Sequence, residues 1–297
     1  MNELSDTFDA PIERFDTAGF SLAYRDVRPD SNDPSAPTIL CVHGNPTWSY
    51  YYRSVAQRFG DRHRVIAVDH IGCGASDKPP RHAFGYTLAD HQSNLVALIE
   101  HLELDNVVLL AHDWGGAIGL GAVVRCRPRF RGIMLLNTAA FPPPYVPLRI
   151  AACRIPLLGT LAVRGLNLFA RAAVTMAMSR NRMRPAVAVN LLEPYDSWEH
   201  RVAIDAFVRD IPLSKRHPTY QTLLDLENSL PQLAELPSLL VWGMQDWCFR
   251  PECLRRFQAA WPNATAVEID DAGHYVIEDA PQETLDAIDS FLQHQIA

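Results

Sequence analysis

The sequence lacks the cysteine patterns of a disulfide-stabilised or zinc-binding protein. Six cysteines occur in 297 residues, spread from Cys41 to Cys253, and none of them forms a C-x-x-C pair. Cysteines this far apart supply neither a disulfide framework nor a tetrahedral zinc site. We therefore expect six reduced thiols in a cytoplasmic protein and no metal site.

An excess of positive charge is also absent. The chain carries 27 Lys and Arg residues against 34 Asp and Glu residues, which gives a formal net charge of −7. A protein that follows a phosphodiester backbone needs a field of the opposite sign. The charge balance excludes a dedicated nucleic-acid-binding role, and we expect no nucleic-acid partner.

No uninterrupted apolar run is long enough to span a bilayer. The first residues, MNELSDTFDAPIERFD, are acidic and lack the basic and apolar regions of a secretory signal. The most apolar stretch, 146–178, is interrupted by Arg149, Arg154, Arg164 and Arg171. Charges at this spacing are too frequent for a spanning helix, so we expect a soluble protein.

Short apolar runs alternate with helix-length segments along most of the chain. Such runs are typical of buried parallel strands, and their alternation with helices predicts an α/β protein with a doubly wound sheet. Helices are expected over 50–59 and 87–102, where Thr87 and Asp90 predict a capping box, and an amphipathic helix closes the chain at 281–295. The six predicted strands are 38–44, 65–72, 107–113, 132–137, 238–243 and 265–270.

The strand rhythm stops after residue 140. Three consecutive prolines, Pro142 to Pro144, open a segment of helical pattern that continues to residue 231. We expect a core formed by 1–140 and 232–297, with a helical cap at 141–231 inserted over the carboxyl edge of the sheet.

A sharp strand-turn-helix is predicted around residue 113. His112-Asp113-Trp114-Gly115-Gly116 follows a predicted strand and precedes a helix rich in alanine and glycine. The nucleophile elbow of one hydrolase class has this form, usually with a serine where Asp113 stands. A carboxylate can displace a leaving group from saturated carbon and form an ester, so we expect Asp113 to be a nucleophile. The alternative is an aspartate that merely caps the helix.

A histidine and a second aspartate follow the last two predicted strands. His274 lies in the loop before the final helix and Asp246 follows the strand 238–243. The chain order nucleophile, acid, histidine suits the same fold, so we expect His274 as base and Asp246 as the acid that orients it. Asp270 and Asp271 are interpreted as loop residues. Solvated loop positions are the alternative for His274 and Asp246.

Two side-chain N–H donors lie beside the predicted nucleophile. Trp114 is its chain neighbour, and Asn45 follows the first predicted strand in His43-Gly44-Asn45-Pro46. An indole and an amide N–H can hold a departing anion or an oxyanion. A packed aromatic and a turn residue are the alternatives. His43, Gly44, Asp69 and Ser76 are interpreted as residues that shape loops.

Five motifs taken together resemble the haloalkane dehalogenase family of α/β-hydrolases: HGNPTWSYYYR, DHIGCGASDKP, AHDWGGAIG, WGMQDW and GHYVIEDAP. The resemblance covers most of 38–137 and 238–294. It implies an α/β-hydrolase fold and assigns the nucleophile to Asp113, the base to His274 and anion binding to Asn45 and Trp114. With Asn137 after one strand and Asp246 after the next, the chain resembles the subfamily with an Asp-His-Asp triad and an Asn-Trp pair.

That subfamily includes the β-lactone decarboxylases of bacterial long-chain olefin biosynthesis, which resemble this chain further in the cap at 141–173 and in DWCF at 246–249. The resemblance implies a cofactor-free lyase that converts a cis-3,4-dialkyl-2-oxetanone, a hydrophobic small molecule, to a cis-alkene and CO2. It also implies assembly with the enzymes that form the lactone.

Several other functions stay open at this point. A haloalkane dehalogenase that hydrolyses a carbon–halogen bond would use the same five residues. An epoxide hydrolase shares the triad but usually has an aromatic residue at the place of Asn45 and tyrosines in its cap. Asp113 contradicts a serine esterase. A noncatalytic binding protein of this fold would be expected to have lost part of the triad.

The predicted cap is basic although the protein is acidic. Between residues 141 and 192 there is no Asp or Glu, whereas seven arginines occur, at positions 149, 154, 164, 171, 180, 182 and 184. Amphipathic segments of this composition suit peripheral contact with a membrane or docking on a partner. A solvated cap surface is the alternative.

Overall fold

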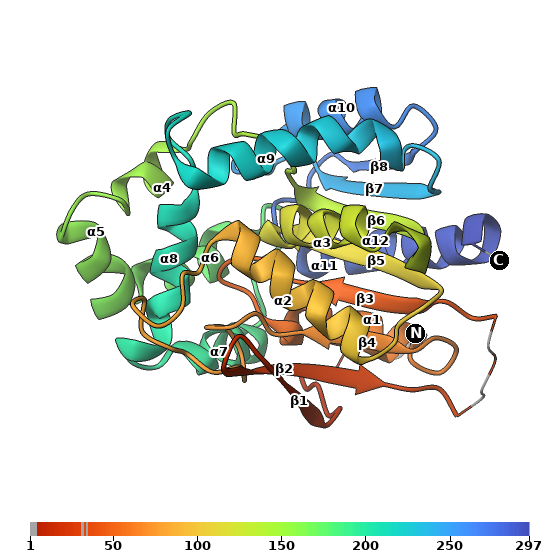
Figure 1. Cartoon of the computed structure of the whole chain (residues 1–297), viewed down its shortest axis with the longest axis horizontal. Helices are drawn as coiled ribbons and strands as arrows, with labels where there is room; N and C mark the ends of the chain where they lie inside the picture. Colours follow the sequence, from red (N-terminus) through yellow and green to blue (C-terminus); the bar gives the residue numbers. More distant parts are fainter. Residues whose placement is uncertain (1–4, 31–32, 34, 297) are drawn as a thin grey trace.

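An eight-stranded sheet forms the centre of the molecule (Figure 1). The computed structural model describes residues 5–30, 33 and 35–296. The strand order is β1-β2-β4-β3-β5-β6-β7-β8, and β3 to β8 pair in parallel, as the sequence predicts. The strands are β1 (Ile12–Thr17), β2 (Phe20–Val27), β3 (Thr38–Val42), β4 (Val65–Val68), β5 (Val107–Asp113), β6 (Phe130–Thr138), β7 (Ser238–Gly243) and β8 (Thr265–Ile269).

The two edges of the sheet differ from the sequence prediction. An antiparallel hairpin of β1 and β2, which the sequence analysis did not predict, turns at Ala18 and Gly19 and joins the sheet through β4. At the other edge β8 is a strand, but it is not buried as predicted. Only Ile269 of β8 is fully buried, because this strand has a single neighbour, β7.

Helices cover both faces of the sheet, as expected for a doubly wound fold (Figure 1). Thr87 forms the predicted capping box of α2: its hydroxyl accepts from the backbone N–H of Asp90, and its own N–H donates to the Asp90 carboxylate. One face carries α2 (Leu88–His101), α3 (Trp114–Arg125), α9 (Pro218–Ser229) and α10 (Pro251–Ala260), and the other carries α1 (Arg53–Phe59), α11 (Val276–Asp279) and α12 (Pro281–Phe291).

A group of short helices lies beyond the carboxyl ends of the parallel strands, at the left of Figure 1. Helix α9, which follows these short helices in the chain, contacts α2 and α3. The boundaries of the cap remain a prediction. None of the helices in the described ranges is long and apolar enough to cross a membrane. The short helices are α4 (Leu148–Ala152), α5 (Leu158–Thr160), the π-helix η3 (Leu161–Gly165), α6 (Leu168–Met176), α7 (Pro185–Leu192) and α8 (Val202–Asp210).

Candidate active site

Asp113 lies on a strained turn between β5 and α3. Its backbone has φ 54° and ψ −130°, and α3 begins at the next residue. A Cβ on Gly115 would stand 2.0 Å from the Val42 carbonyl oxygen, and one on Gly116 would stand 1.9 Å from the Thr138 hydroxyl. Only glycine fits at these two positions, so the two glycines allow the elbow that the sequence predicts.

The loop after β3 closes over the Asp113 carboxylate. The backbone N–H of Asn45 donates to Asp113 Oδ1 at 2.7 Å. A Cβ on Gly44 would lie 2.1 Å from the same oxygen, so this residue must be glycine for the loop to approach so closely. One carboxylate oxygen is therefore held by the protein.

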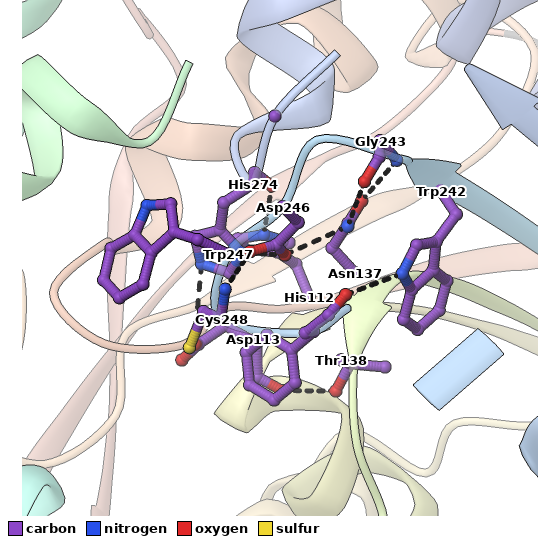
Figure 2. A network of polar contacts seen from close by, with 12 residues as sticks. His112, Asp113, Asn137, Thr138, Trp242, Gly243, Asp246, Trp247, Cys248 and His274 are labelled. Atoms are coloured by element: carbon purple, nitrogen blue, oxygen red, sulfur yellow. Dashed lines mark hydrogen bonds and ion pairs between the residues drawn. The ribbon is translucent and has the colours of Figure 1, made fainter. Parts of the chain in front are cut away.

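His274 bridges the two aspartates (Figure 2). Its Nδ1 lies 2.8 Å from Asp246 Oδ2, and its Nε2 lies 3.6 Å from Asp113 Oδ2. Burial disfavours the charged imidazole, but the attraction and hydrogen bond of Asp246 and the attraction of Asp113 outweigh it and raise the pKa of His274. The three predicted side chains thus form one contiguous polar chain.

Asp113 itself is buried, and burial raises the pKa of its carboxyl. The charge of His274 and hydrogen bonds from the backbone N–H groups of Asn45 and Trp114 act in the opposite direction. A carboxylate with little water around it and a raised pKa is a stronger nucleophile than a solvated one.

Two further buried residues, Asn137 and His112, hold the triad in place. The Asn137 amide donates to Asp246 Oδ2 at 3.0 Å and to the Gly243 carbonyl, and its oxygen accepts from the Gly243 N–H (Figure 2). Burial keeps the pKa of His112 well below its usual range, so this neutral ring donates from Nε2 to the His274 carbonyl oxygen at 2.9 Å. Sequence reasoning gave neither residue a role.

Asn45 and Trp114 lie beside Asp113 in the wall of one cavity. The Asn45 amide donates weakly to the Ile204 carbonyl of α8 at 3.4 Å, and the Trp114 ring packs against Phe207 of the same helix, with 5.6 Å between centroids. No described residue accepts a hydrogen bond from the Trp114 indole. Both donors retain N–H capacity for a bound group.

The cavity has a volume of about 400 Å³ and lies between the sheet and the short helices. Its wall is almost entirely apolar, with Asp113, His274, Asn45 and Trp114 at one place in it. Most of the apolar wall comes from residues between Phe141 and Ala177, among them Pro143, Ile150, Phe169 and Met176. Such a site suits an apolar ligand whose reacting group meets the carboxylate.

The other polar residues considered in the sequence lie in structural positions. The Asp69 carboxylate accepts from the backbone N–H groups of Ser49 and Ala75. Asp271 forms an ion pair with Arg180. The six cysteines are free, and the described residues contain no group of three or more His, Cys, Asp or Glu that could hold a metal ion.

A carboxylate on the elbow of a mostly parallel sheet, with a histidine and an aspartate from later loops, defines the α/β-hydrolase class. The chain belongs to the alpha/beta hydrolase fold family, whose profile matches residues 37–281. Within that family it is similar to two proteins named cis-3-alkyl-4-alkyloxetan-2-one decarboxylase. The one from Shewanella oneidensis is 39% identical over 88% of this chain and 83% of its own, and the one from Xanthomonas campestris is 37% identical over 93% of both.

Haloalkane dehalogenases are also similar. Haloalkane dehalogenase 2 of Mycobacterium tuberculosis is 32% identical over 86% of this chain and 88% of its own. The crystal structure of haloalkane dehalogenase DatA from Agrobacterium tumefaciens C58 superposes with a TM-score of 0.84 and 25% identity, covering 97% of both chains. The resemblance stated from the motifs is confirmed, and so is the fold class.

Proposed function

We propose that this protein is a lyase that decarboxylates cis-3,4-dialkyl-oxetan-2-ones, with Asp113 as nucleophile. The main support is the cavity of about 400 Å³, whose wall is almost wholly apolar. In this wall the buried Asp113 carboxylate lies 3.6 Å from the His274 imidazole. A dialkyl lactone is an apolar molecule with one electrophilic group, and this cavity offers a matching surface. The names of the two decarboxylase relatives support this substrate class.

The reaction balances without water, oxidant or metal. Asp113 Oδ2 attacks ring carbon C4, the C4–O bond breaks, and the ring oxygen leaves as part of a carboxylate. The bond from C3 to this carboxylate then breaks, its electron pair forms the C3=C4 double bond, and the ester bond to Asp113 breaks. The products are CO2, the alkene and the free Asp113 carboxylate.

The geometry of the steps preserves the cis arrangement. Attack by Asp113 from the side opposite the ring oxygen inverts C4, and the two leaving groups then depart in opposite directions. One inversion followed by one anti elimination returns the two alkyl groups to the same side. A cis-lactone therefore gives a cis-alkene.

Asn45 and Trp114 supply the electrostatic part of the proposed reaction. Their side-chain N–H groups line the cavity next to Asp113 and would stabilise the carboxylate that develops when the ring opens. His274 would carry positive charge between Asp113 and Asp246. No water is activated in this cycle, so His274 is not required to act as a base.

A haloalkane dehalogenase is the second candidate, and the Asn45-Trp114 pair favours it. The same two donors would hold a departing halide, and His274 would then activate water to hydrolyse the ester on Asp113. The third candidate, an epoxide hydrolase, needs a tyrosine O–H that points to the substrate. Tyr145, the cap tyrosine found among the cavity-lining residues, instead donates its O–H to the Trp247 and Cys248 carbonyls.

The biological setting is part of the same proposal. We propose that the enzyme acts in the synthesis of long-chain olefins, after a reaction that closes a β-lactone and in association with the enzymes that carry it out. Free thiols at six positions are typical of the cytoplasm, where we propose that the reaction takes place.

A pair of matched substrates tests the proposal. The purified protein is given a cis-β-lactone and a 1-haloalkane of similar carbon number, and alkene and halide release are measured as kcat/KM. We expect alkene from the lactone and at least about a hundredfold lower kcat/KM for halide release, equivalent to about 2.7 kcal/mol of transition-state discrimination. The reverse order of the two values would make the protein a dehalogenase.

A further inference from the structure

The exposed apolar side chains of this protein gather on one part of the cap. Eleven large hydrophobic residues are well exposed among those described, and seven of them lie in one short segment. Single exposed leucines are ordinary, but a cluster of them marks an interaction site. We call the seven residues the apolar cap face; they are Leu148, Ile155, Leu157, Leu158, Leu161, Leu166 and Leu168.

The backbone directs two of these leucines fully outward. Leu148 is 88% exposed at the start of α4, and Leu157 is 86% exposed immediately before α5. Leu157 has φ 64°, a conformation that residues other than glycine adopt only at an energetic cost. Leu158 and Leu161 follow at i and i+3, so they share one side of the next helical turns. The segment therefore presents its leucines outward from several short helices.

Arginines accompany the apolar cap face along the chain, and the segment 141–192 contains no Asp or Glu. Arg154 and Arg164 donate to backbone carbonyls, and Arg149 lies over the Trp247 ring. None of these three, nor Arg171, forms an ion pair with a described carboxylate. Farther along the chain Arg180 pairs with Asp271 and Glu283. Arg149 and Arg171, which are both exposed, are therefore available to an external anionic group.

The cavity of the candidate active site reaches the surface at this face. Arg149 of α4 and Leu168 of α6 both line the cavity and are both exposed. The same two helices turn Ile150 and Phe169 toward the cavity interior. A molecule that leaves the cavity past Arg149 and Leu168 would emerge beside residues of the apolar cap face. In Figure 1, α4 and α5 lie at the end of the molecule away from the C-terminus.

We propose that the apolar cap face docks on the surface of a lipid bilayer with anionic headgroups. The leucines would enter the boundary of the acyl chains, and the arginines would remain at the level of the phosphates. An anionic bilayer offers acyl chains to the exposed leucines and negatively charged phosphates to the arginines near them. The cavity mouth would then open toward the lipid. That last step rests on the proposed function, because it concerns an apolar substrate and product, whereas docking itself does not.

Vesicle flotation tests the docking. The full-length protein is mixed with vesicles of phosphatidylcholine and phosphatidylglycerol or with vesicles of phosphatidylcholine alone. Leu157→Ser with Leu158→Ser changes the apolar cap face, and Arg171→Gln removes a positive charge near it. None of these residues lines the cavity. A control double variant, Ile12→Ser with Val189→Ser, changes exposed apolar residues outside the face and outside the cavity wall. Circular dichroism and thermal midpoints show whether each variant folds as the wild type does.

We expect the wild type to float with the anionic vesicles and more weakly with the neutral ones. The leucine double variant should lower the partition coefficient at least about tenfold, and Arg171→Gln about fivefold on anionic vesicles only. The control variant should stay within about twofold of the wild type. A wild type that remains with the soluble fraction in both mixtures overturns the proposal, as does equal flotation of the leucine variant.

A protein partner is the competing occupant, and sedimentation without lipid identifies it. If the wild type forms an assembly that the leucine double variant breaks, and neither binds vesicles, the face is a protein interface and the proposal is overturned. Alkene formation from a short-chain lactone without vesicles is measured in parallel. Flotation without alkene formation would contradict the proposed function alone, whereas alkene formation without flotation would contradict the docking alone.

Discussion

At the residue scale, the proposed chemistry requires the ionised carboxylate of Asp113. Because burial raises the pKa of this carboxyl above 3.8, the reactive form is lost at a higher pH than for an ordinary aspartate. Activity should therefore rise with pH along an acid limb whose midpoint lies above 3.8. A pH profile of kcat/KM for alkene formation measures this midpoint. A flat profile down to pH 3.8 would contradict a buried carboxylate nucleophile.

His274 separates the two candidate reactions. In a His274→Phe variant, a 1-haloalkane should leave a stable alkyl ester on Asp113, because nothing activates water to hydrolyse it. With a cis-β-lactone no ester should accumulate, since the departure of CO2 releases Asp113 without water. Mass spectrometry of the intact protein detects either adduct. A lactone-derived ester that persists in this variant would show that the lactone reaction also needs hydrolysis.

Asn137 acts on the reaction through Asp246. Replacing it with Ala removes two donated hydrogen bonds and leaves the Gly243 N–H without its acceptor. We expect a loss of about 1–3 kcal/mol in unfolding free energy and a fall in kcat at nearly unchanged KM. The imidazole resonances of His274, followed by NMR titration, should show an altered pKa. An unchanged titration would make the role of Asn137 purely structural.

The five residues predicted for the site lie together in the structure because each follows, or is close to, the carboxyl end of a predicted strand. Asp113 and Asn45 come together for this reason alone, since β5 and β3 are neighbours in the sheet. Asn137 and His112 were missed because their roles depend on partners 109 and 162 residues away. An amide at a strand end and a histidine before a nucleophile carry no pattern that predicts such a distant contact.

At the scale of elements, the approach of α3 to the sheet is set by glycine. A Cβ at Gly116 would meet the Thr138 hydroxyl and Cβ, so Gly116→Ala should destabilise the protein by about 1–3 kcal/mol and displace Asp113. Gly165→Ala is the matched control, because the nearest atom to its Cβ is the flexible end of Leu161 at 2.9 Å and the Trp198 ring lies at an ordinary contact distance of 3.8 Å. Urea unfolding measures both. Equal stability of the two variants would contradict the packing argument.

The cap holds the loop that carries the acid. Tyr145 donates to the Trp247 and Cys248 carbonyls, and the Trp247 indole donates to the Met176 carbonyl of α6. Tyr145→Phe should lower kcat about two- to tenfold, the equivalent of about 0.5–1.5 kcal/mol of positioning, with little change in unfolding free energy. Steady-state kinetics on the lactone tests this. An unaltered kcat would show that the loop needs no support from the cap.

The elements predicted correctly from the sequence are those marked by a continuous apolar run or by a local capping motif. The apolar runs of β3, β5 and β7 are buried throughout, and the Thr87 capping box is local in the chain. The hairpin of β1 and β2 was missed because its partly exposed strands carry several charged residues and no continuous apolar run. The exposure of β8 depends on its place at the edge of the sheet, which the local sequence does not contain.

At the scale of the whole molecule, the short helices and the sheet enclose an apolar cavity whose polar groups lie together around Asp113. The prolines at 142–144 and the helical pattern after them predict an inserted cap, and short helices of this segment lie beyond the carboxyl ends of the parallel strands (Figure 1). The size of the cavity could not be predicted, because it depends on how far α4 and α6 stand from Asp113. The outward direction of the leucines also depends on the fold, although their number is visible in the sequence.

In the proposed reaction, Asp113 of this protein opens a β-lactone to give an alkene. The most direct test is gas chromatography of the alkene formed from a long-chain cis-β-lactone by the wild type and by Asp113→Ala under identical conditions. We predict cis-alkene from the wild type and only the thermal background from the variant. Equal alkene from the two proteins, or none above background from the wild type, would contradict decarboxylation by Asp113.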